Sequence, residues 1–348
     1  NLMLGNTILL KHAESVPESA LAIEKIMAEA GVPEGVYTNI FATHDQISTV
    51  IADPRVQGVS LTGSERAGAA IAAQAGAALK KAVLELGGSD PYVILASYDI
   101  RAAARNALEV RLENTGQACS SNKRIIVHED VYDEFVEKFV KATSDLKLGA
   151  GFDWSAGMGS LAGASQVATV EKYVDDAKDK GAKVVTGGRA RPDLGPYFYE
   201  PTVFTDVSDE VLLKREEVFG PVVYVEKVGS HAEAVEKAND TAYGLNSSVW
   251  GPSKEANEVA AQIYSGTVGV NDGYAAAFAS VDNEMGGTQE SGQGRRQGHY
   301  GMLKYTESQN ITEQRLIPIR GPKFLSAKPY AAVMSLLLVV GKKTKILR

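Results

Sequence analysis

Cysteine is nearly absent from this chain: Cys119 is the only one among 348 residues. A single cysteine excludes an intramolecular disulfide and every zinc site that is built from several thiolates. Histidine is also scarce, and the five histidines show neither an H-x-x-x-H nor an H-E-x-x-H spacing. We therefore expect no metal ion, and a protein that works in a reducing compartment, the cytoplasm.

A strongly basic surface is lacking too. The chain has 36 lysines and arginines against 43 aspartates and glutamates, which gives a formal net charge of −7. No cluster of basic residues with interleaved aromatics occurs in the sequence. This balance argues against nucleic acid as the main partner, so an anionic ligand would have to be held by local charge.

A hydrophobic run of membrane-spanning length is also missing. Residues 331–340 are an apolar segment of ten residues before the basic end 342–348, whereas a spanning helix needs about 20. We expect this segment to be a helix that packs on the protein surface or on a neighbour, with a membrane partner disfavoured. A shallow contact with a membrane interface is the alternative.

The length and composition are those of an ordinary folded protein. With 348 residues, 44% hydrophobic and 23% charged, the chain predicts about two domains with an ample core. No signal peptide is visible, and the sequence opens on Asn1 at the edge of an expected strand. We interpret it as the C-terminal part of a longer protein.

Short β-branched runs alternate with amphipathic stretches throughout most of the chain, as in βαβ units on a parallel sheet. In the first section we expect strands at 7–11, 36–41 and 56–61, and helices at 17–30, 45–52 and 64–78. In the second section we expect helices at 100–113, 131–146, 165–180, 232–238 and 254–264, and strands at 124–128, 183–186, 222–228 and 267–271. The pattern predicts two α/β units.

Cys119 ends the run Asn114-Thr115-Gly116-Gln117-Ala118-Cys119. A lone cysteine is more often a small buried apolar residue than a nucleophile. Here the glycine and the small residues on both sides leave room for a substrate and for backbone N–H groups that could stabilise an oxyanion. Cys119 is therefore a candidate nucleophile, and Glu85 in the earlier run Leu84-Glu85-Leu86-Gly87-Gly88 is a candidate base.

These two motifs together resemble the aldehyde dehydrogenase superfamily. The similarity includes Gly63-Ser64 after a strand, the segment 216–221, Met285-Gly286-Gly287 and Glu290-Ser291-Gly292, in family order from about residue 5 to about residue 314. It implies an α/β, aldehyde dehydrogenase-like fold with a partial Rossmann-type cofactor domain and an α/β catalytic domain.

The resemblance also implies a division of the chain. Residues 1–87 would be the C-terminal half of the NAD(P)-binding domain and residues 88–290 the catalytic domain. Residues 291–317 would be the return segment and oligomerisation strand, and residues 318–348 a C-terminal extension. In the family, the extended run at 303–313 is a strand that joins a sheet across subunits, so we expect a homodimer or homotetramer.

The chemistry that the resemblance implies is oxidation of an aldehyde to an acid. Cys119 would attack the aldehyde to give a thiohemiacetal, and loss of hydride to NAD would leave a thioester. Glu85 would then activate water to release the acid, which favours hydrolysis over acyl transfer. The backbone N–H of Cys119 would help to hold the oxyanion, while the family's upstream Pro-Trp-Asn motif, whose Asn also donates, is absent from this sequence.

Cofactor contacts are implied at seven positions. Two contact the adenosine ribose, two lie at a helix start beside the pyrophosphate, and three lie toward the nicotinamide: Lys11 and Glu14, Gly63 and Ser64, and Leu86, Glu217 and Phe219, respectively. A carboxylate at Glu14 would accept from both ribose hydroxyls and repel the phosphate that distinguishes NADP. NAD is therefore expected, with NADP as the alternative, and Glu216 is expected to be a surface charge.

For the substrate, the resemblance narrows to the succinate-semialdehyde dehydrogenase branch, through the block 66–90 and the segments 294–296 and 304–307. A carboxylate tail needs a cation, and Arg111 is the first candidate, with Ser280 as a pocket serine. A surface arginine paired with Glu109 or Glu113 is the alternative for Arg111. Many members of the branch carry arginine where this chain has Glu113.

Two other functions stay open at this point. A general aliphatic or aromatic aldehyde dehydrogenase would show no preference for a terminal carboxylate. A non-catalytic relative could keep the fold alone, although the presence of both Cys119 and Glu85 argues against it.

Overall fold

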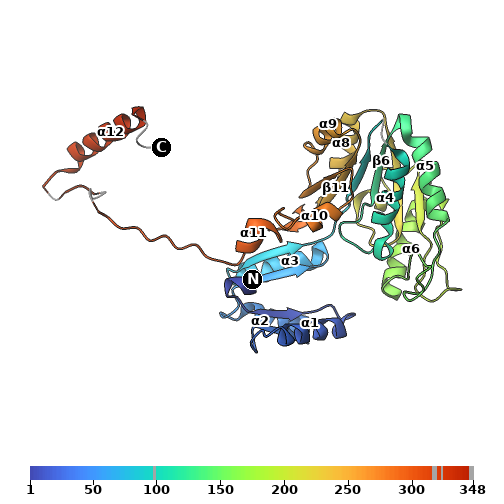
Figure 1. Ribbon diagram of the computed structural model, residues 1–348, viewed down its shortest axis with the longest axis horizontal. Helices are drawn as coiled ribbons and strands as arrows, with labels where there is room; N and C mark the ends of the chain where they lie inside the picture. Colours follow the sequence, from blue (N-terminus) through green and yellow to red (C-terminus); the bar gives the residue numbers. More distant parts are fainter. Residues whose placement is uncertain (97–98, 316–319, 323, 345–348) are drawn as a thin grey trace. The chain divides into compact units, whose positions relative to one another are not determined.

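The structure, a computed structural model, describes residues 1–96, 99–315, 320–322 and 324–344. The chain divides into two units, Asn1–Tyr305 and Thr306–Arg348 (Figure 1). The first unit carries every residue predicted for the site. The predicted domain boundary near residue 87 falls inside this first unit and stays a prediction.

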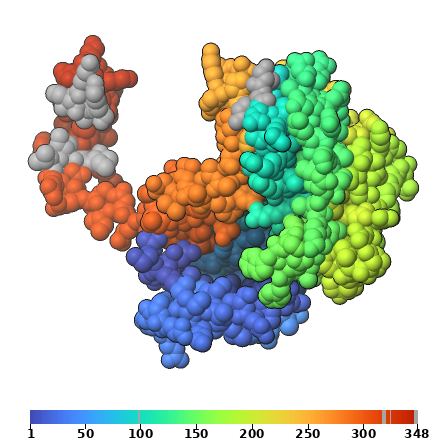
Figure 2. All heavy atoms as spheres, turned by 45° about the vertical axis from the view of Figure 1, so that its right-hand side comes forward, coloured from blue at the N-terminus to red at the C-terminus, as the bar shows by residue number. Residues whose placement is uncertain are grey.

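The N-terminal elements are a small β/α lobe of the first unit, drawn in blue in Figure 2. Strand β1 (Ile8–Lys11) pairs in parallel with β2 (Tyr37–Ile40), and the helices are α1 (Pro17–Glu29) and α2 (His44–Ala52). A short 3-10 turn, η1 (Leu2–Leu4), precedes them. Helix α2 starts where a capping box predicts, since Thr43 and Gln46 satisfy each other's backbone N–H groups. The strand and helix predictions for this lobe are confirmed.

A three-stranded sheet carries the Glu85 motif. Its order is β14-β4-β3, and the strands are β3 (Gly58–Thr62), β4 (Lys81–Glu85) and β14 (Gly292–Gln293). Strand β4 is parallel to β3 and antiparallel to β14. Helix α3 (Glu65–Ala77) connects β3 to β4 and lies beside them in Figure 1. Near residue 292 the chain therefore pairs with the strand that carries Glu85.

The largest sheet has seven strands in the order β12-β11-β5-β6-β9-β8-β7, and only the β7–β8 pair is antiparallel. The strands are β5 (Pro91–Ile94), β6 (Arg124–His128), β7 (Lys183–Thr186), β8 (Thr202–Thr205), β9 (Val222–Val228), β11 (Asn246–Trp250) and β12 (Thr267–Val270). The helices are α4 (Ile100–Leu112), α5 (Glu129–Ser144), α6 (Ala164–Asp179), α8 (His231–Asn239) and α9 (Ser253–Ala260). This is the predicted α/β arrangement.

Helices cover both faces of this sheet (Figure 1). Because successive strand residues point to opposite faces, Tyr92 and Ile94 pack with residues of α4 and α5. Val93 packs on the other side, with residues of α8 and α9. Burial on both faces explains why the central strands are almost entirely apolar.

Short elements complete the first unit. They are η2 (Glu113–Gly116), α7 (Leu212–Arg215), β10 (Tyr243–Gly244), α10 (Ala275–Ala279), β13 (Thr288–Gln289) and α11 (Gly298–Leu303). The expected helix at 254–264 ends earlier, at Ala260, and the remaining residues form turns before β12.

The strand expected at 303–313 is not present in the single chain. Leu303 is the last residue of α11, and residues 306–315 belong to no helix or strand. A strand exists only when a second strand pairs with it, and the pairing that the family resemblance implies is with another subunit. That pairing stays a prediction.

Among its described residues, the second unit contains one helix, α12 (Ala327–Lys343), which confirms the helix expected at 331–340. The apolar side chains of residues 336–340 are exposed, and Lys342 and Lys343 lie in the last turn. Throughout the described ranges, no helix combines the length and apolarity that crossing a membrane requires. Part of the expected extension 318–348 falls outside the described residues.

Candidate active site

A sharp turn leads the chain from α4 to Cys119. Asn114, Thr115 and Gly116 in η2 have positive φ angles of 50°, 60° and 72°, a conformation that costs free energy for residues other than glycine. A Cβ atom on Gly116 would collide with the backbone carbonyl of Gly220. Glycine is therefore required at position 116. Cys119 follows this turn, in the loop between α4 and β6.

The Cys119 side chain is partly buried among charged groups. Burial raises the pKa of its thiol, and the carboxylates of Asp90 and Glu217 raise the pKa further. The ammonium of Lys123 and the backbone N–H of Ser120 act in the opposite direction. The reactivity of the thiol thus depends on the balance between one cation and two anions.

Lys123 is a site residue that the sequence analysis missed. Its side chain is 1% exposed, and Nζ donates to the carbonyl oxygens of Ala118 at 3.1 Å and Cys119 at 2.6 Å. Nζ also lies 2.9 Å from Oε1 of Glu217, although Oε1 accepts no hydrogen bond in the described part of the chain. A lysine at the start of a strand gives no sequence signal for such contacts.

Glu85 ends β4 and is almost completely buried, with 3% of its surface exposed. Burial raises the pKa of its carboxyl, against the lowering effect of Arg296, Arg295 and Lys304. Its Oε1 has no hydrogen-bond partner among the described residues. A buried carboxyl with a raised pKa and an unused oxygen is suited to taking a proton from water near neutral pH.

The two glycines after Glu85 bring its strand to the other segments of the site. A Cβ atom on Gly88 would lie 2.9 Å from the carbonyl oxygen of Cys119. A Cβ atom on Gly87 would lie 2.5 Å from Oε2 of Glu217 and 2.6 Å from Oε1 of Glu65. The structure therefore brings together the Glu85 motif, the Cys119 loop, the start of α3 and the Glu217 loop.

The predicted pyrophosphate position is the N-terminus of α3. The hydroxyl of Ser64 accepts a hydrogen bond from the backbone N–H of Ala67 at 3.3 Å. Gly63 is the residue between the end of β3 and Ser64. Leu86 is buried against the first turns of this helix, since a Cβ atom on Gly68 would lie 2.6 Å from its methyl groups. The helix end presents N–H groups and a positive dipole end to whatever lies beside it.

Residues predicted for the two riboses and the nicotinamide lie on two further segments. Lys11 ends β1 and Glu14 is exposed just beyond it. Phe219 is half-buried, and its carbonyl accepts a hydrogen bond from Gln166. Glu216 is exposed, as expected, and accepts from the hydroxyl of Tyr173 at 2.8 Å.

These surroundings fit a dinucleotide. The closely packed Gly87 brings backbone next to the start of α3, and the buried Oε1 of Glu217 is an acceptor that uses no hydrogen bond. A ribose hydroxyl is a donor that could use it. No three His, Cys, Asp or Glu side chains of the described ranges gather where a metal ion could be held.

The prediction that Arg111 binds the substrate is wrong. Its side chain is 0% exposed, Nε donates to the carbonyl of Val222 at 3.0 Å, and the other nitrogens donate to the hydroxyl of Ser121 and the carbonyls of Val218 and Gly220. Burial lowers the pKa of Arg111 to about 10, although Glu217 and Asp90 oppose this shift. The alternative of a surface arginine paired with Glu109 or Glu113 is wrong as well. Arg111 instead ties the 218–222 segment to α4.

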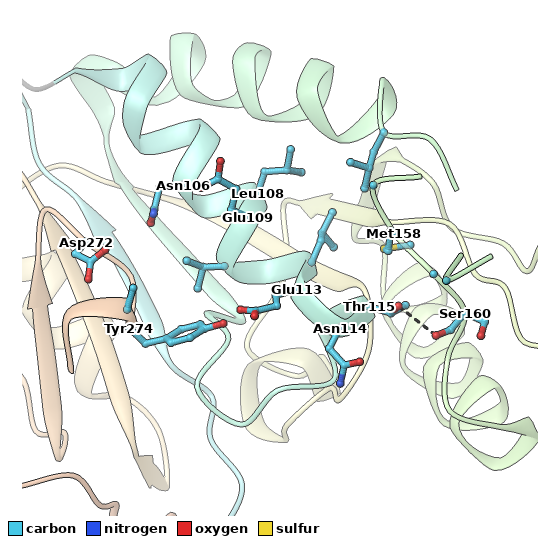
Figure 3. Close-up of a pocket in the computed structure, with 17 residues that line it drawn as sticks. Asn106, Leu108, Glu109, Glu113, Asn114, Thr115, Met158, Ser160, Asp272 and Tyr274 are labelled. Carbon is cyan, nitrogen blue, oxygen red and sulfur yellow. Dashed lines mark hydrogen bonds between the residues drawn. The ribbon is translucent and has the colours of Figure 1, made fainter. Parts of the chain in front are cut away.

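An open cavity of about 890 Å³ lies beside η2 (Figure 3). Its walls come from the end of α4, from η2, from the loop around residues 151–160 and from the segment that enters α10. Its charged lining residues are all acidic: Glu109, Glu113 and Asp272. Neither Arg111 nor Ser280 lines it, and Ser280 lies partly buried at the end of α10.

Comparison with known proteins shows similarity to one enzyme family over most of the chain. The Aldehyde dehydrogenase family matches residues 1–311. A succinate-semialdehyde dehydrogenase [NADP(+)] from Deinococcus radiodurans is 44% identical over 92% of this chain and 68% of its own length. A Mycobacterium ulcerans relative is 43% identical over 99% of this chain and 66% of its own length, so the chain spans slightly under two thirds of that protein.

Solved structures of aldehyde dehydrogenases have a similar fold. The succinic semialdehyde dehydrogenase of Streptococcus pyogenes, in complex with NADP+, superposes with a TM-score of 0.84 and 40% identity, covering 88% of this chain and 66% of the other. A lactaldehyde dehydrogenase from Escherichia coli gives a TM-score of 0.82 with 33% identity, covering 87% of this chain and 64% of the other. The α/β fold and these similarities show that the chain belongs to the aldehyde dehydrogenase family.

Proposed function

We propose that this chain serves an NAD(P)-dependent dehydrogenase that oxidises an aldehyde to a carboxylic acid. The observation that carries the proposal is the meeting of two segments: Gly88, just after Glu85, packs on the carbonyl of Cys119, and the buried Glu85 has an unused carboxyl oxygen. Nucleophile and base are both needed for hydrolysis through a covalent intermediate. Their presence also argues against a non-catalytic relative.

In this proposal the thiolate of Cys119 attacks the carbonyl carbon of the aldehyde and forms a thiohemiacetal. The backbone N–H of Cys119 donates to the developing oxyanion. A bound nicotinamide would supply the hydride acceptor, and loss of the hydride from the same carbon would leave a thioester on Cys119. Glu85 then takes a proton from a water molecule that attacks the thioester, the thiolate leaves, and the carboxylic acid is released.

We propose that Gly63 and Ser64 hold the pyrophosphate at the start of α3. Lys11 and Glu14 would lie at the adenosine ribose, and Leu86, Glu217 and Phe219 at the nicotinamide side. For the choice of cofactor, the exposed carboxylate of Glu14 favours NAD, whereas the names of the similar proteins favour NADP. Because Glu14 is exposed, water weakens its repulsion of a phosphate that Lys11 attracts, so we propose that both dinucleotides are used.

Succinate semialdehyde is the first substrate that we propose, on the strength of the two succinate-semialdehyde dehydrogenases that this chain resembles. The second candidate is an uncharged aldehyde. It is favoured by the complete burial of Arg111, which removes the predicted cation for a carboxylate tail.

The test uses the full-length gene product. Formation of reduced nicotinamide is followed with succinate semialdehyde, butanal and benzaldehyde, each with NAD and with NADP. The Cys119→Ala variant is the control for background reduction. Turnover that requires Cys119 supports the proposal and the preferred aldehyde decides between the candidates; no turnover with any aldehyde, from folded protein, would contradict it.

We also propose that the enzyme is a homodimer or homotetramer, with residues 303–313 as the strand that pairs between subunits, and that it works in the cytoplasm. The support is the family resemblance of this segment, which forms no helix or strand at 306–315 within the chain, and the presence of a single cysteine. Mass photometry of the full-length protein tests the oligomer. A monomer at micromolar concentration would contradict it.

A further inference from the structure

Lys123 is a buried cation that contacts two functional segments at once. It lies at the start of β6, next to Arg124. Two of its hydrogen bonds hold carbonyl oxygens of the Cys119 loop, and its charge is paired with Glu217 of the loop between α7 and β9. Lys123 is the cation that lowers the pKa of the Cys119 thiol, against burial and the carboxylates of Asp90 and Glu217.

The contact with Glu217 differs from the two contacts with the Cys119 loop. Nζ donates hydrogen bonds to the carbonyls of Ala118 and Cys119, which fix the backbone of the loop. The approach to Glu217 is a charge pair without a hydrogen bond at Oε1. A buried carboxylate oxygen without a donor is costly, so Glu217 would gain free energy from any hydroxyl donor that reached it.

We propose that Lys123 is a positioning residue that couples the two loops: when Glu217 turns to the hydroxyls of a dinucleotide ribose, the charge of Lys123 is left to stabilise the Cys119 thiolate. The inference rests on the proposed function, which places the ribose at Glu217. The thiol is thereby activated when the hydride acceptor is in place. Before that, the pair with Glu217 keeps the thiol less reactive.

The direction in which the pKa of the Cys119 thiol moves follows from the charges that face it. They are Lys123, Asp90 and Glu217. With Glu217 beside Lys123, the negative charge of Glu217 offsets most of the electrostatic effect of Lys123 on the thiol. Asp90 adds a second carboxylate near the thiol. Removal of Glu217 from the pair leaves one cation opposite one anion, which lowers the free energy of the thiolate relative to the thiol. A shift of about one pKa unit changes the thiolate fraction below the midpoint about tenfold.

The experiment measures the rate of Cys119 alkylation by iodoacetamide as a function of pH, in the full-length protein without aldehyde. Peptide mass spectrometry follows the modification of Cys119 itself. The midpoint of each pH profile is compared with and without NAD or NADP, for the wild type, Lys123→Met, Glu217→Gln and the double variant. The midpoint reports the thiol, and steric shielding by the nicotinamide does not move it.

Three results are expected. Lys123→Met raises the midpoint and slows alkylation at neutral pH about tenfold, whereas Glu217→Gln lowers the midpoint without any dinucleotide. A dinucleotide lowers the midpoint of the wild type and leaves that of Lys123→Met unchanged. An equal midpoint in Lys123→Met and wild type, or an equal dinucleotide shift in both, would overturn the proposal.

Controls separate this role from simple stability. Lys80→Met removes another lysine whose Nζ donates to two backbone carbonyls, those of Ile51 and Asp53, and it should leave the midpoint unchanged. Lys123→Met strands the Glu217 charge and can impair folding, so the double variant, which buries no lone charge, supplies the comparison without Lys123. Failure to oxidise aldehydes, with these midpoint shifts intact, would contradict the proposed function and not this coupling.

Discussion

Gly292 in β14 pairs with Glu85 in β4, although the two residues lie far apart in the sequence. The next residue of the motif extends the contact, since the backbone N–H of Leu86 donates to the carbonyl of Ser291 at 3.0 Å. A Cβ atom on Gly292 would collide with the carbonyl of Leu84, so this strand pair needs a glycine. The return segment near residue 290 therefore fixes the backbone of the proposed base.

Glu85→Gln should stop turnover but not the first chemical step. The amide cannot take a proton from water, so we expect steady-state kcat to fall by about 10²- to 10⁴-fold. A burst of one reduced nicotinamide per site should remain, because acylation of Cys119 precedes hydrolysis. Stopped-flow absorbance separates the two phases. An unchanged steady-state rate would show that another group activates the water.

Gly116→Ala should misplace the Cys119 loop. The added methyl group would collide with the carbonyl of Gly220, and the residue has a φ of +72°. We expect a loss of about 1–3 kcal/mol in the free energy of unfolding, together with lower kcat. Urea denaturation checks the stability. The matched control is Gly76→Ala, where nothing lies within 4 Å of the added atom in a helix, and which should be neutral or stabilising.

Arg111→Ala should behave as a folding variant. The guanidinium is buried and donates to three carbonyls of the 218–222 segment, which would be left without donors. We expect about 3–5 kcal/mol lower free energy of unfolding, as is usual when a buried charged partner is removed. Chemical denaturation measures it. A stable Arg111→Ala protein with a higher KM for succinate semialdehyde alone, and not for butanal, would restore the substrate role.

Asp90 should make stability fall with rising pH. Burial raises the pKa of its carboxyl to about 7, with Lys123 acting in the opposite direction. Because the folded state binds this proton more tightly than the unfolded state, its stabilising effect is full at low pH and is lost as pH rises toward 7. Asp90→Asn should therefore reduce the difference in stability between about pH 5 and pH 8. If the stability difference between these two pH values were the same in Asp90→Asn and the wild type, a group other than Asp90 would cause it.

Glu14→Gln should shift the cofactor preference toward NADP. The neutral amide removes the repulsion of the extra phosphate, so we expect kcat/KM for NADP relative to NAD to rise about tenfold. Glu14 is exposed, and the substitution should leave stability unchanged. Initial rates with both dinucleotides give the ratio. A constant ratio would remove Glu14 from the ribose site.

The sequence motifs led directly to Cys119 and Glu85, because glycines crowd around both residues and a nucleophile and a base need such open backbone. Lys123 and Arg111 could not be interpreted in the same way. Arg111 donates to the backbone carbonyls of the distant residues Gly220 and Val222, and a carbonyl leaves no trace in the sequence. Lys123 contacts the nearby carbonyls of Ala118 and Cys119, but its charge partner Glu217 comes from a distant loop.

Some strands were not predicted, for a related reason. Strand β11 was missed because Asn246, Ser247 and Ser248 resemble a loop, yet all three are buried in the large sheet, between β12 and β5. Ser247 pairs its hydroxyl with that of Ser265, 2.8 Å away, which a local pattern cannot show. Strand β14 has two residues, too few for any periodicity. Long amphipathic helices such as α5 and α6 were predictable because their apolar faces repeat.

The central claim is that an acyl group is carried on Cys119 and released by Glu85. The most direct measurement mixes the full-length Glu85→Gln enzyme with NAD or NADP and the aldehyde that the wild type prefers, quenches the reaction in acid, and analyses the Cys119 peptide by mass spectrometry. We predict a thioester adduct of the acyl mass on Cys119, formed with about one equivalent of reduced nicotinamide. An unmodified Cys119 in a folded variant that has produced that equivalent would contradict the account.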